Sequence, residues 1–299
     1  MKHLKEYINE SILSSTGSGF AGKSEELKNW FLNGCSELYN AAAYIHEIDI
    51  QLVENHYDII IPKTTKFFKS VKRHKAYLTI SNKWKDLEKY LPMINCIRFD
   101  NGIVPNIQFE DVHIKTTKIL PVRCGKKINF VNSSIDVFNS VPQGVFTVIF
   151  DEYLEGNPNH VGSFENIFVP TINADLCDGK WTLDCKLENF KNCGTERVGN
   201  LNSCFGQTGG LYIHETMFNT KNVFDKEDPF FLTQEATDEL DELFSNNPLR
   251  NGKGIDNADK IRIYNSKKHK FVKIDFNKEK RVYKMREDNF NFDSSILNK

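Results

Sequence analysis

A short phrase recurs between residues 135 and 204 and constrains the fold more than any other feature of the sequence. In each copy an apolar residue is followed by three further positions at steps of four, three and three residues, with one residue inserted in the third copy. The copies start at Phe138, Leu154 and Phe190. Self-similarity at short range is typical of stacked units, in which each repeat buries its apolar positions only against its neighbours. The phrase predicts an irregular solenoid and leaves the chemistry open.

The region around the phrase has the pattern of short strands. Residues 93–218 contain apolar triplets, such as IQF at 107–109, that are separated by Asn, Gly, Asp and Pro. Turn signals this frequent leave no room for crossover helices, so we expect a β-rich region. The steps from Ile128 to Val148 and from Val148 to Ile167 are about twenty residues, within the leucine-rich-repeat range. An irregular β-sandwich is the alternative architecture.

Two stretches in this region resemble a known class of protein. Residues 153–162, YLEGNPNHVG, and residues 187–193, LENFKNC, are similar to degenerate leucine-rich-repeat-like proteins that are common in Bacteroides phages and their hosts. The chain departs from regular repeats in unit length, and the pattern is interrupted between residues 166 and 186. The resemblance implies a protein that acts by contact with other proteins, and a continuous horseshoe and the sandwich both stay open.

The amino terminus has the pattern of an amphipathic helix, because Leu4, Ile8 and Ile12 are spaced four residues apart and share one face. Residues 1–11, MKHLKEYINES, resemble the amino termini of proteins of large tailed bacteriophages, including the crAss-like phages. In some tailed phages similar leaders direct proteins into the prohead, and a maturation protease cuts after an Ile/Leu-x-Glu triplet, which Ile8 and Glu10 would supply. The resemblance implies a location in the virion or the host-cell cytoplasm. The alternative is an ordinary helix docked on its own domain.

Residues 17–24, GSGFAGKS, match the P-loop pattern G-x-x-x-x-G-K-[ST]. In a P-loop, backbone N–H groups wrap the phosphates of a nucleotide, the lysine neutralises them and the serine hydroxyl binds magnesium. The residues in these positions are Gly17, Gly22, Lys23 and Ser24. Residues 145–152 resemble a Walker B strand that ends in Asp151 and Glu152. An NTPase also needs a buried strand before Gly17, beside the Walker B strand. In this sequence an expected helix and a Ser/Thr run precede Gly17, so the alternative interpretation is that residues 17–24 form a solvated linker.

Two segments near the carboxyl terminus carry opposite charge. Residues 225–242 are strongly acidic, and within them a helix is expected to begin at Thr233 and to turn Leu240 and Leu243 inward. Farther on, period-two alternation joined by Asn/Ser/Lys turns predicts a three-stranded antiparallel meander with one basic face. Its strands are expected at residues 260–264, 270–276 and 281–285.

The basic face of the meander is a candidate surface for nucleic acid or for an acidic partner. Its cations are Lys260, Arg262, Lys267, Lys268, Lys270, Lys273, Arg281 and Lys284. Tyr264 and Tyr283 are available to stack on bases. The acidic helix over residues 235–242 is the competing occupant, since a chain of net charge -1 has enough acid of its own to cover this face. Nucleic acid is therefore the less favoured partner.

Composition excludes several classes of protein. A chain of 299 residues that is 39% apolar can bury a substantial core, and its apolar runs are too short to span a membrane. The seven cysteines form no C-x-x-C pair and, without an export signal, indicate reduced thiols. Cys177, Cys185 and Cys193 are spaced more widely than zinc ligands, so we expect small core residues there, and neither a metal nor a cofactor.

Together these patterns predict an α+β protein with amino-terminal helices, a central β-rich repeat region and a carboxy-terminal helix with the meander. The expected segments are 1–23 (leader helix and linker), 24–92 (mixed α/β, helical to about Asn55), 93–218 (β-rich repeats) and 219–299 (acidic helix and basic meander). The favoured function is a non-enzymatic bacteriophage protein, either virion-associated or a protein-interaction module whose partners are other proteins. An NTPase and a nucleic-acid-binding protein are the alternatives.

Overall fold

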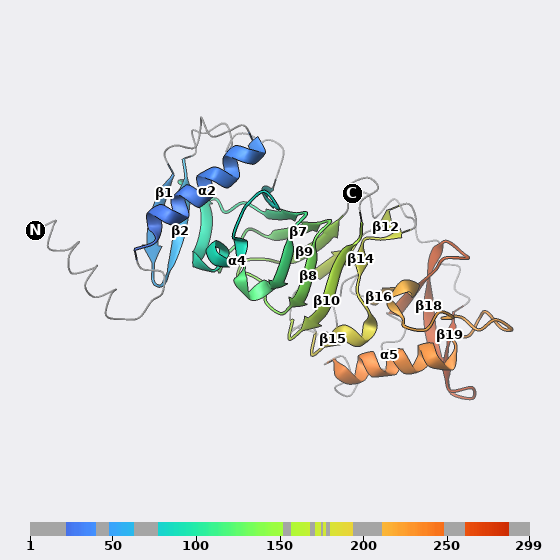
Figure 1. Ribbon diagram of the computed structural model, residues 1–299. Helices are drawn as coiled ribbons and strands as arrows, with labels where there is room; N and C mark the ends of the chain where they lie inside the picture. The colour runs from blue at the N-terminus through green and yellow to red at the C-terminus, as the bar shows by residue number, and fades with distance from the viewer. Residues whose placement is uncertain are drawn as a thin grey trace, which may run out of the picture. The chain divides into compact units, whose positions relative to one another are not determined.

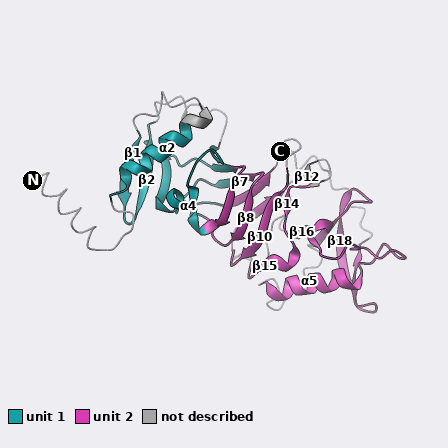
Figure 2. Ribbon diagram, viewed as in Figure 1, with its two compact units in different colours: residues 1–109, 118–128, 142–145 teal, residues 110–117, 129–141, 146–299 magenta. Residues whose placement is uncertain are grey.

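A computed structural model describes residues 22–39, 48–62, 77–151, 157–167, 171–174, 176–177, 180–193, 211–247 and 261–286 (Figure 1). These residues form a mixed α/β fold with few helices and many strands in several sheets, which agrees with the predicted α+β class. The chain divides into two compact units (Figure 2). Unit 1 comprises residues 1–109, 118–128 and 142–145, and unit 2 comprises residues 110–117, 129–141 and 146–299. The four-segment division stays a prediction.

Unit 1 contains a helix and a three-stranded sheet. The helix is α2 (Ser24–Tyr39), and the sheet has the order β1 (Asp49–Val53), β2 (His56–Ile61) and β4 (Ile94–Phe99), with β1 antiparallel and β4 parallel to β2. Leu27 and Phe31 of α2 are buried, as their four-residue spacing predicts. The other elements of this part of the chain are β3 (Leu78–Ser81), α4 (Leu87–Tyr90), η2 (Leu91–Met93), β5 (Ile107–Glu110) and η3 (Thr117–Ile119).

The helical pattern expected to continue to about Asn55 is wrong for residues 49–53, which form β1. Val53 pairs with His56 across a two-residue turn, in which Glu54 takes a left-handed conformation with φ of 55°. Backbone pairing with β2 along this hairpin overrides the weak helical periodicity of the segment.

Parallel strands form the first part of unit 2. One sheet has the order β14 (Leu183–Asp184), β10 (Asn159–Glu165), β8 (Ser134–Phe138) and β6 (His113–Thr116), and β15 (Phe190–Lys191) also pairs with β10. In another sheet β9 (Thr147–Asp151) lies between β7 (Lys127–Val131) and β11 (Thr171–Ala174), and β9 and β11 are parallel. The pairings within the first sheet are parallel as well. Parallel neighbours cannot be joined by a tight turn, so the paired strands of this sheet lie far apart in the sequence.

Buried phenylalanine rings set the register of these strands. Phe138 pairs with Phe164, which pairs with Phe190, and the last two rings stack with centroids 4.8 Å apart. Further ring contacts come from Phe130 and Phe150. This register corrects the repeated phrase, which placed Leu154 level with Phe138. Leu154 lies outside the described residues, and the residue level with Phe138 is Phe164. The packing of inward-facing rings fixes this pairing, because the spacing of apolar residues along the sequence allows more than one register.

Buried polar side chains hold the parallel strands together where β10 begins. The side chain of Asn159 accepts a hydrogen bond from the Ser133 amide at 2.9 Å and donates to the carbonyl oxygens of Asp151 and Thr182 at 2.7 and 3.2 Å. The Asn159 amide also donates to the Thr182 carbonyl at 2.8 Å. Asn159 is completely buried, and these contacts pair its side chain with backbone groups that include those of the buried Ser133 and Thr182.

The second part of unit 2 is a four-stranded sheet. Its order is β16 (Leu211–His214), β17 (Ile261–Asn265), β18 (Lys270–Asn277) and β19 (Val282–Met285). β17, β18 and β19 are antiparallel neighbours, which confirms the predicted meander, and β16 adds a parallel strand that the sequence did not predict. The remaining short elements are β12 (Leu176–Cys177), β13 (Lys180–Trp181), η4 (Leu187–Asn189) and η5 (Glu215–Met217).

The acidic helix is α5 (Gln234–Asn246). The Thr233 hydroxyl caps it by accepting a hydrogen bond from the Ala236 amide at 3.3 Å, as expected for a helix that begins after Thr233. Leu240 and Leu243 are buried, so the predicted inward face is confirmed.

The interpretation of the cysteines as core residues is confirmed for Cys185 and Cys193, which are both buried. Burial raises the pKa of each thiol above its ordinary value, because a thiolate would be poorly solvated there. The side chain of Cys177 lies outside the described residues.

Candidate binding surfaces

The P-loop-like motif lies partly within the described residues. The Lys23 amide donates to the Tyr57 hydroxyl at 3.3 Å, and α2 begins at Ser24. Asp151 ends β9. The other predicted site residues Ile8, Glu10, Gly17, Glu152 and Lys260 lie outside the described part of the chain.

The sheet around β9 does not provide the arrangement that an NTPase requires. The predicted nucleotide site needs the strand before Gly17 to lie beside the strand that ends in Asp151. Both edges of β9 are occupied, by β7 and β11, and both of these strands follow residue 126 in the sequence. Both neighbours of β9 therefore belong to the described residues, and neither of them precedes Gly17.

The outer face of the parallel sheet carries exposed histidines and carboxylates. His113, Ser134, His160 and Asp184 stand level with one another on β6, β8, β10 and β14. His160 Nδ1 lies 3.2 Å from Asp184 Oδ2, and both side chains are more than half exposed, at 59% and 57%. Parallel sheets are usually covered on both faces, so a polar, exposed outer face is an uncommon feature and a candidate contact surface.

Three residues on this face make contacts of the kind seen in a Ser-His-Asp triad. His113 Nδ1 lies 2.8 Å from Ser134 Oγ, and His113 Nε2 lies 3.6 Å from Asp136 Oδ2. Asp136 is 54% exposed, whereas the carboxylate of a catalytic Ser-His-Asp triad is buried. The Ser134 amide already donates to the Val112 carbonyl, so it cannot stabilise an oxyanion. The arrangement supports binding through hydrogen bonds and not acyl transfer.

One row of cations crosses the four-stranded sheet. Arg262 on β17 pairs with Lys273 on β18, and the Arg286 amide donates to the Lys273 carbonyl at 2.9 Å. Lys284 lies on the same face, because it pairs with Asp275, which is two residues from Lys273. Arg286 forms an ion pair with Asp275 at 2.8 Å. Four cations and one carboxylate therefore give this face an excess of positive charge.

The expectation that the acidic helix covers this face is wrong. α5 contacts β19 through Tyr283, whose hydroxyl donates to Asp241 Oδ1 at 3.1 Å and whose amide donates to the Thr237 hydroxyl. Successive side chains of a strand point to opposite faces, so Tyr283 and Lys284 lie on opposite sides of the sheet. α5 packs on the apolar face of the sheet, because burying that face stabilises the fold. Tyr283, which lies on this face, is only 1% exposed.

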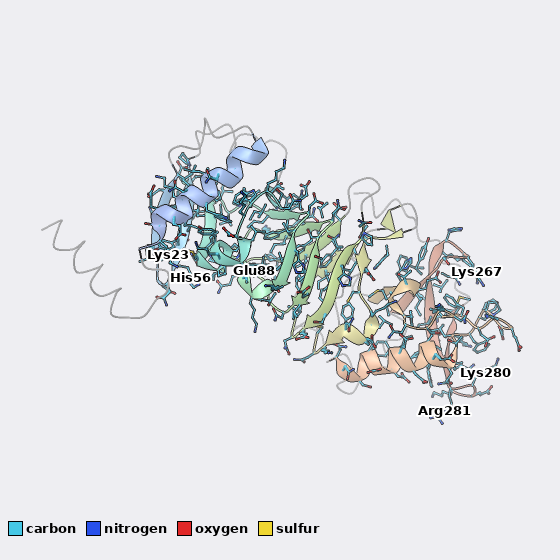
Figure 3. The ribbon with its side chains drawn as sticks, viewed as in Figure 1. Lys23, His56, Glu88, Lys267, Lys280 and Arg281 are labelled. Carbon is cyan, nitrogen blue, oxygen red and sulfur yellow. The ribbon has the colours of Figure 1, made fainter. Side chains whose placement is uncertain are left out.

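The predicted basic residues are divided between this face and the turns. Arg262, Lys273 and Lys284 lie on the face. Lys267 and Lys268 lie in the turn before β18, and Arg281 lies in the turn after it, so they occupy opposite ends of the strand, as Figure 3 shows for Lys267 and Arg281. Lys270 is on the face opposite to Lys273 by alternation. Arg286 was not among the residues predicted for this face. It stands two positions after Lys284, so the period-two alternation of side chains along β19 places it on the same face.

An aromatic cluster adjoins the basic row on the same sheet. The imidazole of His214 lies between Trp181 and Tyr264, with centroids 5.4 and 5.0 Å away and nearly parallel planes. Its Nδ1 accepts from the Thr216 amide at 3.2 Å. Burial lowers the pKa of His214 to about 4, so the ring is neutral at pH 7. Tyr264 is buried in this cluster and is therefore not available to stack on a nucleic-acid base.

Comparisons with protein-family models, curated proteins and solved structures find no match to this chain. Among the described residues no helix is long and apolar enough to cross a membrane. Within the same residues, no three His, Cys, Asp or Glu side chains gather where they could hold a metal ion.

Proposed function

We propose that this is a non-enzymatic, virion-associated bacteriophage protein that contacts a protein partner through the outer face of an irregular parallel β-solenoid. The observation that carries the proposal is the row of His113, Ser134, His160 and Asp184 on neighbouring parallel strands, in which all but the half-buried Ser134 are exposed. A row of this kind offers hydrogen-bond donors and acceptors at a regular spacing of about 4.8 Å, which suits an extended protein surface.

The solenoid is favoured over a β-sandwich by the direction and spacing of the strands. Sandwich sheets are antiparallel, whereas β6, β8 and β10 are parallel, with Ile114 paired to Ile135 and Ile135 paired to Val161. Paired residues lie more than twenty positions apart, a length in the range of one solenoid coil. Backbone contacts between successive coils repeat: the Ser134 amide donates to the Val112 carbonyl, and the His160 amide donates to the Ser133 carbonyl.

Exposure and charge favour a protein as the occupant of this face. Its carboxylates at Asp136 and Asp184 repel an anionic polymer, while the imidazoles at His113 and His160 offer hydrogen-bonding nitrogens to a protein partner. The phage origin is supported by the resemblance of residues 1–11 to phage leaders, which lies outside the described residues.

The proposal is tested by incorporation into particles. Host cells that express a tagged copy of the chain are infected, and the tagged protein in purified virions is measured by mass spectrometry. The double variant His160→Ala with Asp184→Ala should be incorporated roughly tenfold less than the unchanged chain, the loss expected when one good polar contact is removed. A double variant of exposed residues outside the face, Lys221→Ala with Glu227→Ala, is the matched control. Absence of the unchanged chain from particles, or equal incorporation of both variants, would contradict the proposal.

A second candidate function is binding of a polyanion, such as nucleic acid, and the basic row favours it. Arg262 on β17, Lys273 on β18 and Arg286 directly after β19 are neighbours, and α5 packs on the other face of the sheet. If these cations contact phosphates, each neutralised phosphate contributes about 0.9 to the slope of log affinity against log salt concentration on duplex DNA.

Two opposite variants test this candidate in a salt titration of DNA binding. Asp275→Asn removes the carboxylate within the row and should raise affinity, whereas Lys273→Ala with Arg286→Ala should lower the slope by about 2. Changing Lys267 and Arg281 in the turns to alanine is the control, because these residues do not share the face. Undetectable binding at low salt, or a larger effect of the turn variant, would rule the candidate out.

A further inference from the structure

A pocket of about 450 Å³ opens in unit 1 between α2 and the segment that leads into α4. α2 supplies Glu26, Asn29 and Trp30 to its wall, and the following segment supplies Lys83, Trp84 and other residues up to Tyr90. The volume is within the range of pockets that hold small ligands in proteins. None of the motifs discussed above uses this pocket.

The floor of the pocket is aromatic and tightly packed. Trp30 stacks on Tyr90 with centroids 5.0 Å apart, and the edge of Trp30 meets Trp84 at 5.1 Å. Gly34 permits this arrangement, since a Cβ atom there would lie 2.3 Å from Trp84 Cδ2. Such a floor is held in place before any ligand arrives, which lowers the entropy cost of binding.

Two polar groups of the floor are already paired within the protein. The indole N–H of Trp30 donates to the Lys85 carbonyl at 2.6 Å, and the Tyr90 hydroxyl donates to Glu26 Oε1 at 3.0 Å. Glu26 also pairs with Lys89. Hydrogen bonds from Lys89 and Tyr90 lower the pKa of Glu26, so this carboxylate is ionised at pH 7.

The indole N–H of Trp84 is different, because it is buried and has no hydrogen-bond partner among the described residues. Trp84 is 2% exposed and lines the pocket. A buried donor without an acceptor is costly, and native proteins rarely leave one unless a water molecule or a ligand supplies the acceptor. The nitrogen itself is closed off from solvent, so an acceptor can reach it only if the Trp84 ring shifts.

The rim of the pocket is polar and balanced in charge. Lys83 and Lys85 contribute two cations, and Glu26 and Asp86 contribute two carboxylates. The amide of Asn29 adds both a donor and acceptors. A strongly anionic or cationic ligand would meet as much repulsion as attraction at this rim. A neutral ligand with many hydroxyl groups can instead donate to the carboxylates and accept from the ammonium groups.

We propose that this pocket binds a neutral mono- or disaccharide. The C–H groups of a sugar ring pack on the aromatic floor, and its hydroxyls pair with Asn29, Lys83 and Asp86 at the rim. The site is separate from the outer face of the parallel sheet, so either assignment can fail without the other.

The test uses the full chain labelled with 5-fluorotryptophan and read by ¹⁹F NMR. The protein has three tryptophans: Trp30 and Trp84 line the pocket, and Trp181 belongs to unit 2 and serves as the internal control. Glucose, galactose, N-acetylglucosamine and lactose are titrated to roughly 10 mM, the range of weak sugar affinities. At least one of these sugars should shift the Trp84 and Trp30 signals to saturation and leave the Trp181 signal in place.

Variants of exposed rim residues complete the test without disturbing the core. Asn29→Ala and Asp86→Asn, the latter keeping a residue that tolerates the left-handed conformation of position 86, should each weaken the sugar affinity roughly tenfold, while Asn82→Ala, an exposed change outside the pocket, should leave it unchanged. The assignment is overturned if no neutral sugar moves the Trp84 signal, or if glucose 6-phosphate or inorganic phosphate saturates the pocket and neutral sugars do not. It is also overturned if Asn82→Ala weakens binding as much as Asn29→Ala.

Discussion

The parallel strands and the antiparallel meander of unit 2 fix their registers in different ways. In the meander, turns of a few residues join β17 to β18 and β18 to β19, so each strand meets its partner through local sequence. In the parallel sheet the partners lie more than twenty residues apart, and buried rings and the polar contacts of Asn159 determine which residues stand level. Stability should therefore depend on interior residues more in the parallel sheet than in the meander.

The largest effect is expected from truncating the central ring of the parallel region. Phe164 is completely buried and contacts the rings of Phe138, Phe150 and Phe190. Phe164→Ala should lower the free energy of unfolding by about 4 kcal/mol, through lost burial and the cavity left behind. Urea denaturation followed by circular dichroism measures the change. Phe146→Ala is the control, because Phe146 is exposed and its truncation should cost under about 1 kcal/mol. Similar costs for the two variants would contradict the central position of Phe164.

The next effect compares two buried asparagines. Asn159→Ala should cost about 3 kcal/mol, because the Ser133 amide and the carbonyls of Asp151 and Thr182 lose their partner together. Asn265→Ala in the meander should cost about 1 kcal/mol, because the side-chain oxygen of Asn265 accepts one backbone hydrogen bond, from Lys268, and the adjoining turn already fixes the register. Equal costs in denaturation experiments would show that the two sheets do not differ in this way.

Sequence reasoning succeeded where structure is local. The meander, the cap of α5 at Thr233 and the burial of Leu240 and Leu243 follow from alternation, turn residues and helical spacing, all of which act within about ten residues. The pairing of Phe138 with Phe164 did not follow, because apolar residues recur at several spacings and only packing in three dimensions selects one.

The candidate sites were predicted less well for the same reason. The basic residues were identified, but their division between one face and two turns depends on strand boundaries, and the position of α5 depends on which face of the sheet is apolar. The pocket proposed to bind a sugar combines α2 with residues 83–90, more than forty positions away, and no sequence pattern joins these segments.

A pH effect of intermediate size is expected in the meander region. The folded-state pKa of His214 is lowered to about 4 by burial, whereas an unfolded histidine titrates near 6.5. Below pH 6.5 the unfolded state binds a proton that the folded state excludes, so stability falls as pH decreases from 6.5 towards 4. Between pH 7 and pH 5 the loss should be about 2 kcal/mol.

The measurement is the free energy of unfolding as a function of pH in two variants. His214→Phe keeps an aromatic ring between Trp181 and Tyr264 and should remove this part of the pH dependence, whatever its effect on stability at pH 7. His160→Gln changes an exposed histidine and should retain it. An unchanged slope in His214→Phe would show that His214 is accessible to protons in the folded protein.

The smallest effect on stability is expected at the outer face of the parallel sheet, where contact with a partner is proposed. His160 and Asp184 are more than half exposed, and solvent screens their interaction, so Asp184→Asn should change the free energy of unfolding by less than about 0.5 kcal/mol. A residue retained for stability would show a measurable loss in denaturation, and a residue retained for binding would show a loss only when the partner is present. If Asp184→Asn lowers stability by as much as Asn159→Ala, this row belongs to the structural framework of the parallel sheet, and the proposal that it forms a contact surface fails.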